Sequence, residues 1–327
     1  MAASIVSFAP DDSNLEILKN AFGEDVGIEW VDSNQDLNSA AEALKDTVAI
    51  ILPGNRVTVP VKLAEKCPNL KLIQTISAGT DYLDKTSLGE LGIKVSNNGG
   101  GNAVSVAEHT IALIVGVYRK IQLQYINVQN GKWQGNIRSE WGFQSHELTG
   151  KTVGIVGLGR IGSELAKRLQ GWDCDVIYSD VVSEDPPIAK ELNIRRVSID
   201  EIIEKSDIIT LHVPLNSQTR GMISDDQFDR MKPTSVLINA CRGAVVDEAA
   251  LIRAMESNKI MAAGLDVLEK EPTPENNPLI DYENVLITPH LAGFSQEAYT
   301  KSHAFAVRNS LKVSSGEAPD SVVLPDD

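Results

Sequence analysis

The sequence predicts an α/β protein made of two doubly wound parallel-sheet domains. Short apolar runs alternate with helical patterns along the chain, which is typical of parallel strands joined by crossover helices. Two breaks interrupt this alternation, one at Asn97–Asn102 with its three glycines and one at Pro289-His290 with nearby Gly293. A length of 327 residues is sufficient for two domains.

We expect the first domain to begin with five short buried strands. They are predicted at Ser4–Phe8, Ile28–Val31, Val48–Leu52, Leu70–Ile76 and Ile93–Ser96. The glycines of the first break favour a flexible connection, so we place a domain crossing there. One long amphipathic helix is expected next, over about Ala103–Asn130.

A second series of strands follows, and a helix comes last. The strands are predicted at Val153–Val156, Val176–Ser179, Arg195–Val197, Ile208–Val213, Ser235–Ala240, Met261–Val267 and Val285–Thr288. The helix, about Gln296–Val313, has the apolar spacing of a segment that packs onto a core. We therefore expect residues 101–289 to form one domain, inserted into another that consists of residues 1–100 and 290–327. Two crossings between two domains predict a hinged cleft for a ligand.

The strand that ends at Val156 runs directly into the segment Gly157–Gly162, which has the pattern GxGxxG. Gly157 permits a tight turn, Gly159 lets the backbone approach a pyrophosphate, and Gly162 lets the next helix pack closely on the strand. The N-terminus of that helix, at Arg160 and Ile161, offers free N–H groups to the phosphates. This context predicts a dinucleotide site, and a glycine-rich turn in an ordinary βαβ unit is the alternative.

Asp180 ends the next apolar run, where a carboxylate is placed to accept hydrogen bonds from the adenosine ribose hydroxyls. A carboxylate there repels a 2′-phosphate, and no Arg or Lys follows within residues 181–184. The sequence therefore predicts a Rossmann domain that binds NAD rather than NADP.

The composition is that of an ordinary globular protein, with 42% hydrophobic and 23% charged residues. A net charge of −15 argues against nucleic acids and anionic membrane surfaces as partners. The three cysteines (Cys67, Cys174 and Cys241) form no CxxC pair, so we expect no metal site and a reducing, cytoplasmic location. The chain has no signal-peptide pattern and no run of about 18 apolar residues, so no membrane span is expected.

Catalysis by a hydride carrier also requires a group that moves a proton, and histidine suits this role near neutral pH. His109 and His303 lie within helical patterns and are interpreted as structural, while His146 lies in a polar loop. His212 and His290 each follow the carboxyl end of a predicted strand, where ligands bind in open α/β sheets. Both remain candidates from residue chemistry, with a modest preference for His290 because it lies at the second crossing.

Two further features bear on chemistry. Arg242 follows a predicted strand, where a guanidinium can bind a carboxylate or polarise a carbonyl group, and a surface ion pair is the alternative. The loop Leu268–Pro272 supplies carboxylates, one of which can orient a histidine and favour its protonated form, and a solvated charged loop is the alternative. Cys241 has no identifiable base, so a nucleophilic role is not expected.

Several motifs, in order along the chain, resemble those of the D-isomer-specific 2-hydroxyacid dehydrogenases. They are Ser77–Asp84, Ser105–Thr110, Gly157–Gly162, Leu211–Leu215, Asn239–Gly243 with Val245–Glu248, Gly264–Val267 with Glu271-Pro272, and Thr288–His290. The resemblance covers nearly the whole chain, most clearly residues 70–293. It implies a Rossmann NAD-binding domain inserted into a flavodoxin-like substrate domain, and a homodimer.

The resemblance also implies roles for matched positions. His290 would be the general acid/base, Glu271 its carboxylate partner, and Arg242 the group that binds the substrate's carboxylate and carbonyl oxygens. The implied substrate-binding residues are Ser77, Ala78, Gly79, Arg242 and His290. Besides the glycine motif and Asp180, the implied cofactor-binding residues are Val106, His212, Pro214, Thr219, Ala240, Cys241, Asp266 and Gly293. Asp266 would bind the nicotinamide carboxamide, and the choice between the two histidines falls on His290.

The implied reaction is hydride transfer between NAD(H) and a small D-2-hydroxy acid/2-oxo acid pair, of the glyoxylate or hydroxypyruvate reductase type. Phosphite dehydrogenase is an alternative, although such enzymes place a lysine in the loop that here reads Ile76–Asp81 and contains none. An NAD(H)-sensing, corepressor-like scaffold is an alternative of another class. Arg56 is a candidate contact for a second anionic group, and Trp133, Trp141 and Phe143 are candidate anchors of the dimer interface.

Overall fold

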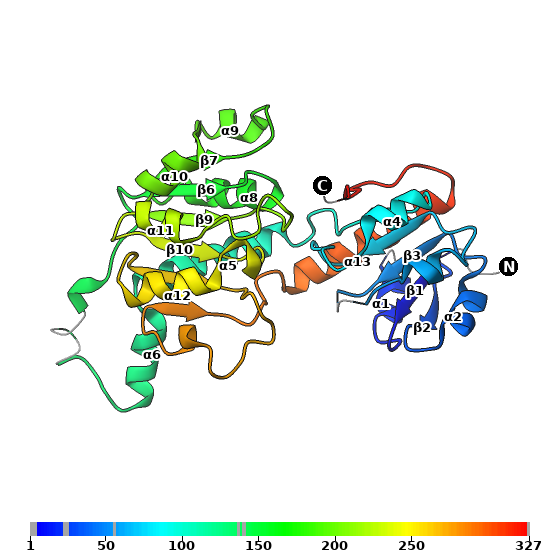
Figure 1. Ribbon diagram of the computed structural model, residues 1–327, viewed down its shortest axis with the longest axis horizontal. Helices are drawn as coiled ribbons and strands as arrows, with labels where there is room; N and C mark the ends of the chain where they lie inside the picture. Colours follow the sequence, from blue (N-terminus) through cyan, green and yellow to red (C-terminus); the bar gives the residue numbers. More distant parts are fainter. Residues whose placement is uncertain (1–4, 22–25, 55–56, 136–137, 139–141, 326–327) are drawn as a thin grey trace. The chain divides into compact units, whose positions relative to one another are not determined.

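The computed structural model of the protein describes residues 5–21, 26–54, 57–135, 138 and 142–325. The chain divides into two compact units, which are Met1–Asn102 with Phe294–Asp327, and Ala103–Gly293 (Figure 1). The crossings expected near residues 101 and 290 lie close to these divisions. Which unit binds which ligand remains a prediction.

The smaller unit contains a five-stranded parallel sheet of order β2-β1-β3-β4-β5. Its strands are β1 (Ile5–Ala9), β2 (Glu29–Asp32), β3 (Ala49–Leu52), β4 (Leu72–Thr75) and β5 (Lys94–Ser96). Its helices are α1 (Leu15–Asn20), α2 (Leu37–Leu44), α3 (Val61–Ala64), α4 (Lys85–Glu90) and α13 (Gln296–Ser314). One core lies under α2, α3 and α4, and a second lies under α1 and α13, so helices cover both faces of the sheet. The order 2-1-3-4-5 is that of the flavodoxin-like fold.

The larger unit contains a seven-stranded parallel sheet of order β12-β11-β10-β9-β6-β7-β8. Its strands are β6 (Thr152–Val156), β7 (Asp175–Ser179), β8 (Arg195–Arg196), β9 (Ile208–Leu211), β10 (Val236–Asn239), β11 (Ala262–Leu265) and β12 (Val285–Ile287). Counted from β6, the first six strands follow the Rossmann order 3-2-1-4-5-6, with β12 added at the edge. The predicted fold class is therefore confirmed for both sheets.

Helices also cover both faces of the larger sheet. They are α5 (Ala103–Tyr118), α6 (Ile121–Gln129), α8 (Arg160–Leu169), α9 (Pro187–Glu191), α10 (Ile199–Lys205), α11 (Asp225–Arg230) and α12 (Glu248–Glu256), with 3-10 turns η1 (Gly142–Gln144), η2 (Gly243–Val245) and η3 (Pro278–Ile280). The apolar faces of α5 and α8 pack on one side of the sheet, and those of α10, α11 and α12 on the other. Among the helices described in either unit, none is both long enough and apolar enough to cross a bilayer.

The single helix expected over about Ala103–Asn130 is in fact two helices, so that prediction was wrong. Lys120 has a left-handed φ of 51° between α5 and α6. The carbonyl oxygen of Tyr118 accepts a hydrogen bond from the N–H of His146 at 3.0 Å, rather than from the next helical turn. The break depends on this long-range contact and contains neither Gly nor Pro, so local apolar spacing carried no signal of it.

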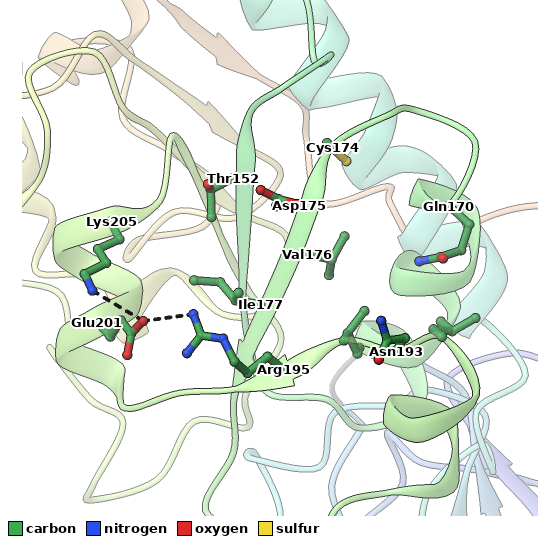
Figure 2. Close-up of a pocket in the computed structure, with 12 residues that line it drawn as sticks. Thr152, Gln170, Cys174, Asp175, Val176, Ile177, Asn193, Arg195, Glu201 and Lys205 are labelled. Atoms are coloured by element: carbon green, nitrogen blue, oxygen red, sulfur yellow. Dashed lines mark hydrogen bonds and ion pairs between the residues drawn. The ribbon is translucent and has the colours of Figure 1, made fainter.

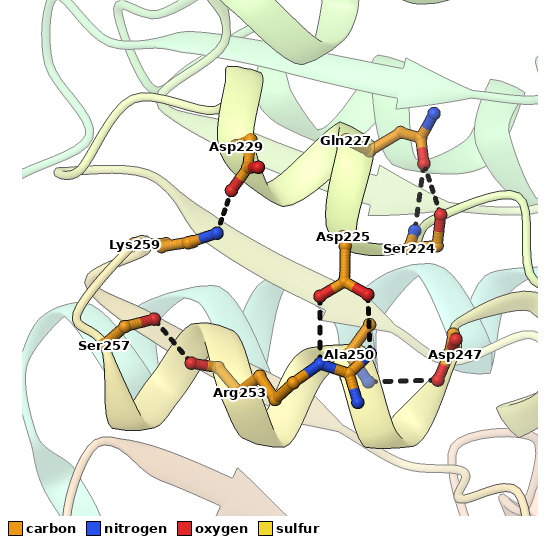
Figure 3. A network of polar contacts seen from close by, with 9 residues as sticks. All are labelled: Ser224, Asp225, Gln227, Asp229, Asp247, Ala250, Arg253, Ser257 and Lys259. Carbon is orange, nitrogen blue, oxygen red and sulfur yellow. Dashed lines mark hydrogen bonds and ion pairs between the residues drawn. The ribbon is translucent and has the colours of Figure 1, made fainter.

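A network of polar contacts ties α11 to α12 on the surface of the larger unit (Figure 3). Asp225 of α11 accepts two hydrogen bonds from the guanidinium of Arg253 on α12, at 3.0 and 2.6 Å. Asp247 caps α12 by accepting a hydrogen bond from the N–H of Ala250 at 3.0 Å. These contacts fix the start of α12, which comes soon after Arg242 in the chain.

Candidate active site

The glycine-rich turn joins β6 to α8. Gly157 has a left-handed φ of 93°, and a Cβ there would lie 2.6 Å from the carbonyl oxygen of His212. A Cβ at Gly162 would overlap the carbonyl oxygen of Gly157, so α8 approaches the turn closely only because residue 162 has no side chain. At Gly159, which precedes α8, a Cβ would meet no described atom within 4 Å apart from its chain neighbours. The turn therefore combines tight geometry with an open backbone at a helix N-terminus, which fits a dinucleotide pyrophosphate.

Asp180 follows β7 and faces this turn. Its carboxylate accepts hydrogen bonds from the N–H groups of Leu158 (2.7 Å) and Val182 (2.9 Å). Arg196, a cation near the same loop, donates to the carbonyl oxygen of Val182 (2.5 Å) and to the carboxylate of Asp185 (2.6 Å). A carboxylate at the predicted ribose position, beside a guanidinium that already bonds groups of the protein, favours ribose hydroxyls over a 2′-phosphate.

The structure gathers most predicted site residues at one edge of the larger sheet. Gly157–Gly162 follow β6, Asp180 follows β7, His212, Pro214 and Thr219 follow β9, Ala240, Cys241 and Arg242 follow β10, Asp266 and Glu271 follow β11, and His290 and Gly293 follow β12. The carboxyl ends of parallel strands share an edge, so residues far apart in sequence meet there. Val106 differs, because it lies in the first turn of α5 and is buried.

His290 and Glu271 are in direct contact. The Nδ1 of His290 lies 2.7 Å from the Oε2 of Glu271, and the Oε1 of Glu271 accepts a hydrogen bond from the N–H of Leu268 at 3.1 Å. The backbone of His290 has a left-handed φ of 56°, and its N–H donates to the carbonyl oxygen of Asp266 at 2.8 Å. The imidazole is 42% exposed, so it is accessible to a small molecule. Because Nδ1 faces the carboxylate, Nε2 is the nitrogen that can exchange a proton with a substrate.

Asp266 anchors the backbone that carries His290. The side chain of Asp266 is buried and accepts hydrogen bonds from the N–H groups of Leu291 (3.0 Å) and Ala292 (2.8 Å) and from the hydroxyl of Thr288 (2.6 Å). These donors lie on both sides of His290 in the chain, so one carboxylate holds the whole segment. The role of Asp266 toward the nicotinamide carboxamide remains a prediction.

Arg242 lies in the turn after β10. Its Nη1 donates to the carbonyl oxygen of Cys241 at 2.7 Å. The next residue, Gly243, packs against the loop that carries Glu271, because a Cβ at position 243 would overlap the backbone of Leu268. The turn that carries Arg242 and the loop that carries Glu271 therefore meet backbone to backbone.

Burial keeps both His212 and Cys241 uncharged near neutral pH. Burial lowers the pKa of His212 to about 4, and burial raises the pKa of the Cys241 thiol to about 11. The Nε2 of His212 lies 2.8 Å from the hydroxyl of Thr210, while its Nδ1 is buried without a hydrogen-bond partner among the described residues. An unsatisfied polar atom at this edge fits a site that a cofactor completes. A neutral imidazole is a poor proton donor, so this environment favours His290 over His212 as the acid/base.

In the smaller unit, the loop after β4 contains Ser77, Ala78 and Gly79, and its carbonyl groups are held by internal hydrogen bonds. The carbonyl oxygen of Ser77 accepts from the N–H of Asn98 at 3.0 Å, and that of Ala78 accepts from the side-chain amide of Asn97 at 3.3 Å. The carbonyl oxygen of Gly79 accepts from the Ser77 hydroxyl at 2.9 Å. The backbone of the predicted substrate loop thus has a defined conformation.

Two cavities of the larger unit lie at the opposite edge of its sheet. One, of about 440 Å³, is bordered by the first residues of β6, β7 and β8, and Figure 2 shows Glu201 there between Arg195 (3.0 Å) and Lys205 (3.6 Å). The other, of about 600 Å³, is bordered by the first residues of β11 and β12. Ligands of open parallel sheets bind beyond the carboxyl ends of the strands, so neither cavity is assigned to the active site.

Sequence reasoning did not single out several of the contacts that hold this site. Thr288 was present in a quoted motif, but its bond to Asp266 follows only from the fold. The bond between the Leu268 N–H and Glu271 is a backbone contact, which no residue pattern reveals. Two earlier candidates, Arg56 and Trp141, lie outside the described residues.

The Rossmann sheet, its glycine-rich turn and the paired histidine and carboxylate define a nicotinamide-dependent oxidoreductase. A model of the NAD-binding domain of the D-isomer-specific 2-hydroxyacid dehydrogenases matches residues 111–292. The chain belongs to this family, whose members are NAD-dependent enzymes that act on CH–OH donors. The predicted family and the predicted cofactor, NAD, are thereby confirmed.

Relatives are similar over most of the chain. A glyoxylate reductase of Thermofilum pendens is 37% identical over 268 residues, which cover 81% of this chain and 78% of that enzyme. A D-3-phosphoglycerate dehydrogenase of Archaeoglobus fulgidus is 40% identical over 252 residues, 76% of this chain but 46% of that enzyme, so the chain spans about half the length of this relative. The solved structure of a glyoxylate reductase from Paecilomyes thermophila has a TM-score of 0.86 at 26% identity and 99% coverage of both chains.

Proposed function

We propose that the protein is an NADH-dependent reductase of a small 2-oxo acid, with Arg242, Glu271 and His290 as its catalytic residues. The observation that carries this proposal is the 2.7 Å contact between His290 and Glu271 beyond the carboxyl ends of a Rossmann sheet. The similarity to enzymes named glyoxylate reductase supports an acid of the glyoxylate or hydroxypyruvate type.

In this proposal the glycine-rich turn and Asp180 hold the cofactor. Backbone N–H groups of Arg160 and Ile161, at the start of α8, receive the pyrophosphate, and Asp180 accepts hydrogen bonds from the ribose hydroxyls. When bound, the reduced cofactor supplies the hydride. The remaining proposed cofactor-binding residues are Val106, His212, Pro214, Thr219, Ala240, Cys241, Asp266 and Gly293.

The protein's own groups would bind the acid, polarise it and deliver a proton. Arg242 binds the carboxylate of a 2-oxo acid and stabilises negative charge that develops on the carbonyl oxygen. His290 donates the proton from Nε2 to that oxygen, because its Nδ1 faces Glu271. The Glu271 carboxylate orients the imidazole by its contact with Nδ1. Ser77, Ala78 and Gly79 are proposed as further substrate-binding residues on the family resemblance.

The experiment that tests the proposal is NADH oxidation against glyoxylate, hydroxypyruvate, pyruvate, 2-oxoglutarate and bulkier 2-oxo acids, with NADPH in parallel. Fast turnover of a small acid with NADH is expected. Tight NADH binding without turnover of any acid would contradict the proposal and favour an NAD(H)-sensing scaffold. NAD-dependent oxidation of phosphite in place of these acids would favour phosphite dehydrogenase.

We also propose that the protein is a homodimer. Figure 1 shows α6 extending away from the sheet of the larger unit, and its side chains Ile121 and Tyr125 are exposed. Trp133 and Phe143, which follow α6, are 75% and 82% exposed. Large apolar side chains concentrated in one exposed stretch mark an interaction surface. Light scattering should give the mass of two chains, and a fully active single chain would contradict this proposal.

A cytoplasmic location is proposed from the cysteines. Cys67 and Cys241 are buried, Cys174 is half-buried, and all three are free thiols. Free thiols are stable in a reducing compartment. Fractionation of the source cells should recover the protein with cytoplasmic markers, and recovery with an oxidising compartment would contradict this location.

A further inference from the structure

Glu271 lies in a stretch of chain that has no helix or strand to hold it. Between the end of β11 and the start of η3 the backbone is irregular, and we call residues 266–277 the Glu271 loop. No hydrogen-bond ladder of regular structure fixes this loop, so individual contacts must set its position. The contact between Glu271 and His290 depends on that position.

Glu248 bonds the Glu271 loop at two points. Its Oε2 accepts a hydrogen bond from the N–H of Glu269 at 2.8 Å, and its Oε1 accepts one from the side-chain amide of Asn277 at 2.8 Å. Glu269 precedes Glu271 and Asn277 follows it, so one carboxylate holds both arms of the loop. The side chain of Asn277 is buried, and its oxygen accepts a further bond from the N–H of Leu279 at 3.0 Å.

Glu248 is itself on a fixed element. It is the first residue of α12, which Asp247 caps, and its side chain is half-buried. Figure 3 shows the same helix bound to α11 through Arg253 and Asp225. Glu248 thus connects a rigid helix to an irregular loop, which is the arrangement that transmits position to a catalytic side chain.

We propose that Glu248 is a positioning residue that holds Glu271 against His290 by bonding both arms of the Glu271 loop. This inference rests on the proposed function, in which Glu271 and His290 act together. Glu248 belongs to the motif Val245–Glu248, and the family resemblance implies no role for it. Its effect on the reaction is exerted through Glu271.

Exchanging the donor and the acceptor between positions 248 and 277 distinguishes a positioning role of Glu248 from a general effect on folding. The change Glu248→Gln leaves one acceptor oxygen for two donors, so the bond to Glu269 or the bond to Asn277 is lost in either orientation of the amide. The change Asn277→Asp brings two carboxylates face to face. In the double variant E248Q/N277D, the amide at position 248 donates to the carboxylate at position 277, and its oxygen still accepts from Glu269. Both bonds are therefore restored with donor and acceptor exchanged.

The experiment compares E248Q, N277D and E248Q/N277D with the unaltered enzyme, using NADH and the 2-oxo acid that it reduces fastest. The control is D225N, an acid-to-amide change that removes a contact to the same helix away from the Glu271 loop. Each single variant should lower kcat about tenfold or more, because a small misplacement of a catalytic group slows the reaction steeply. The NADH affinity and the KM of the acid should stay within about twofold, because neither ligand contacts Glu248 in the proposed mechanism. The double variant should recover most of kcat, and D225N should retain it.

Two outcomes would overturn the inference: single variants with unaltered kcat, or a double variant as slow as the single ones. If the single variants fail to fold, the double variant decides, because restored bonds predict near-normal kcat. H290A is measured alongside. Unaltered turnover by H290A would refute the proposed function, whereas inactive H290A with fully active E248Q would refute only the role of Glu248.

Discussion

Replacing Gly243 with alanine should slow catalysis more than it weakens NADH binding. A Cβ at position 243 would lie under 3.0 Å from three atoms, namely the carbonyl carbon and oxygen of Leu268 and the nitrogen of Glu269. Ordinary contacts of a Cβ begin at 3.4 Å, so the turn after β10 and the Glu271 loop must separate by more than about 1 Å. All three atoms belong to the backbone, so no side-chain rotation can relieve the overlap.

The size of the effect follows from this geometry. The φ of Gly243 is not in the left-handed region, so alanine is compatible with the local backbone and the effect is purely steric. Overpacking of this kind costs about 1–3 kcal/mol of stability. Displacement of Glu271 from His290 should lower kcat about 10- to 100-fold. The glycine-rich turn and Asp180 belong to other loops and keep their proposed contacts to the pyrophosphate and the ribose, so the Kd of NADH should change less than kcat.

The assay is steady-state reduction of the best 2-oxo acid, with NADH affinity measured by fluorescence and the thermal midpoint by melting. Gly171→Ala is the matched control, because a Cβ there would meet no atom of the described residues within 4 Å beyond its chain neighbours, and the backbone is not left-handed. The control should be indistinguishable from the unaltered enzyme. An unaltered kcat for Gly243→Ala, with a normal melting midpoint, would refute the idea that this contact sets the position of Glu271.

Three further predictions test the site. His290→Asn should lower kcat about 10²- to 10⁴-fold with NADH still bound, and a smaller loss would exclude it as the acid/base. Asp180→Ala combined with Val181→Arg should shift the ratio of kcat/KM for NADPH to kcat/KM for NADH about a hundredfold toward NADPH, because it removes an anion and adds a charge-assisted donor. An unchanged ratio would contradict the proposed role of Asp180. Burial lowers the pKa of His212 from 6.5 to about 4. Between these pH values the unfolded chain binds more protons than the folded protein, so the stability of the fold decreases as the pH falls through this window. In denaturant titrations, the free energy of unfolding of the unaltered protein should fall by about 2 kcal/mol more between pH 7 and pH 5 than that of His212→Gln. An equally steep fall in both proteins would show that His212 is not its source.

Most strands were predictable because they are short apolar runs that are buried on both faces of a parallel sheet. The exceptions are β2 and β8, which lie at the ends of their sheets and are more exposed. The cofactor turn was predictable because Gly157 and Gly162 are required by local geometry, a left-handed φ and a close backbone approach. The end of α5 was not predictable, because the bond from His146 that ends it comes from a distant loop.

The sequence by itself determined the alternation of strands and helices, the glycine-rich turn with Asp180, and the family of the chain. It also left His212 and His290 as rival bases from residue chemistry. Only the tertiary structure half-buried His212 in a site that keeps it neutral and brought His290 to within 2.7 Å of Glu271. It likewise joined Glu248 to both arms of the Glu271 loop. Local spacing encodes helices, strands and turns, whereas a contact between residues on different loops depends on how the parallel sheet aligns the ends of its strands.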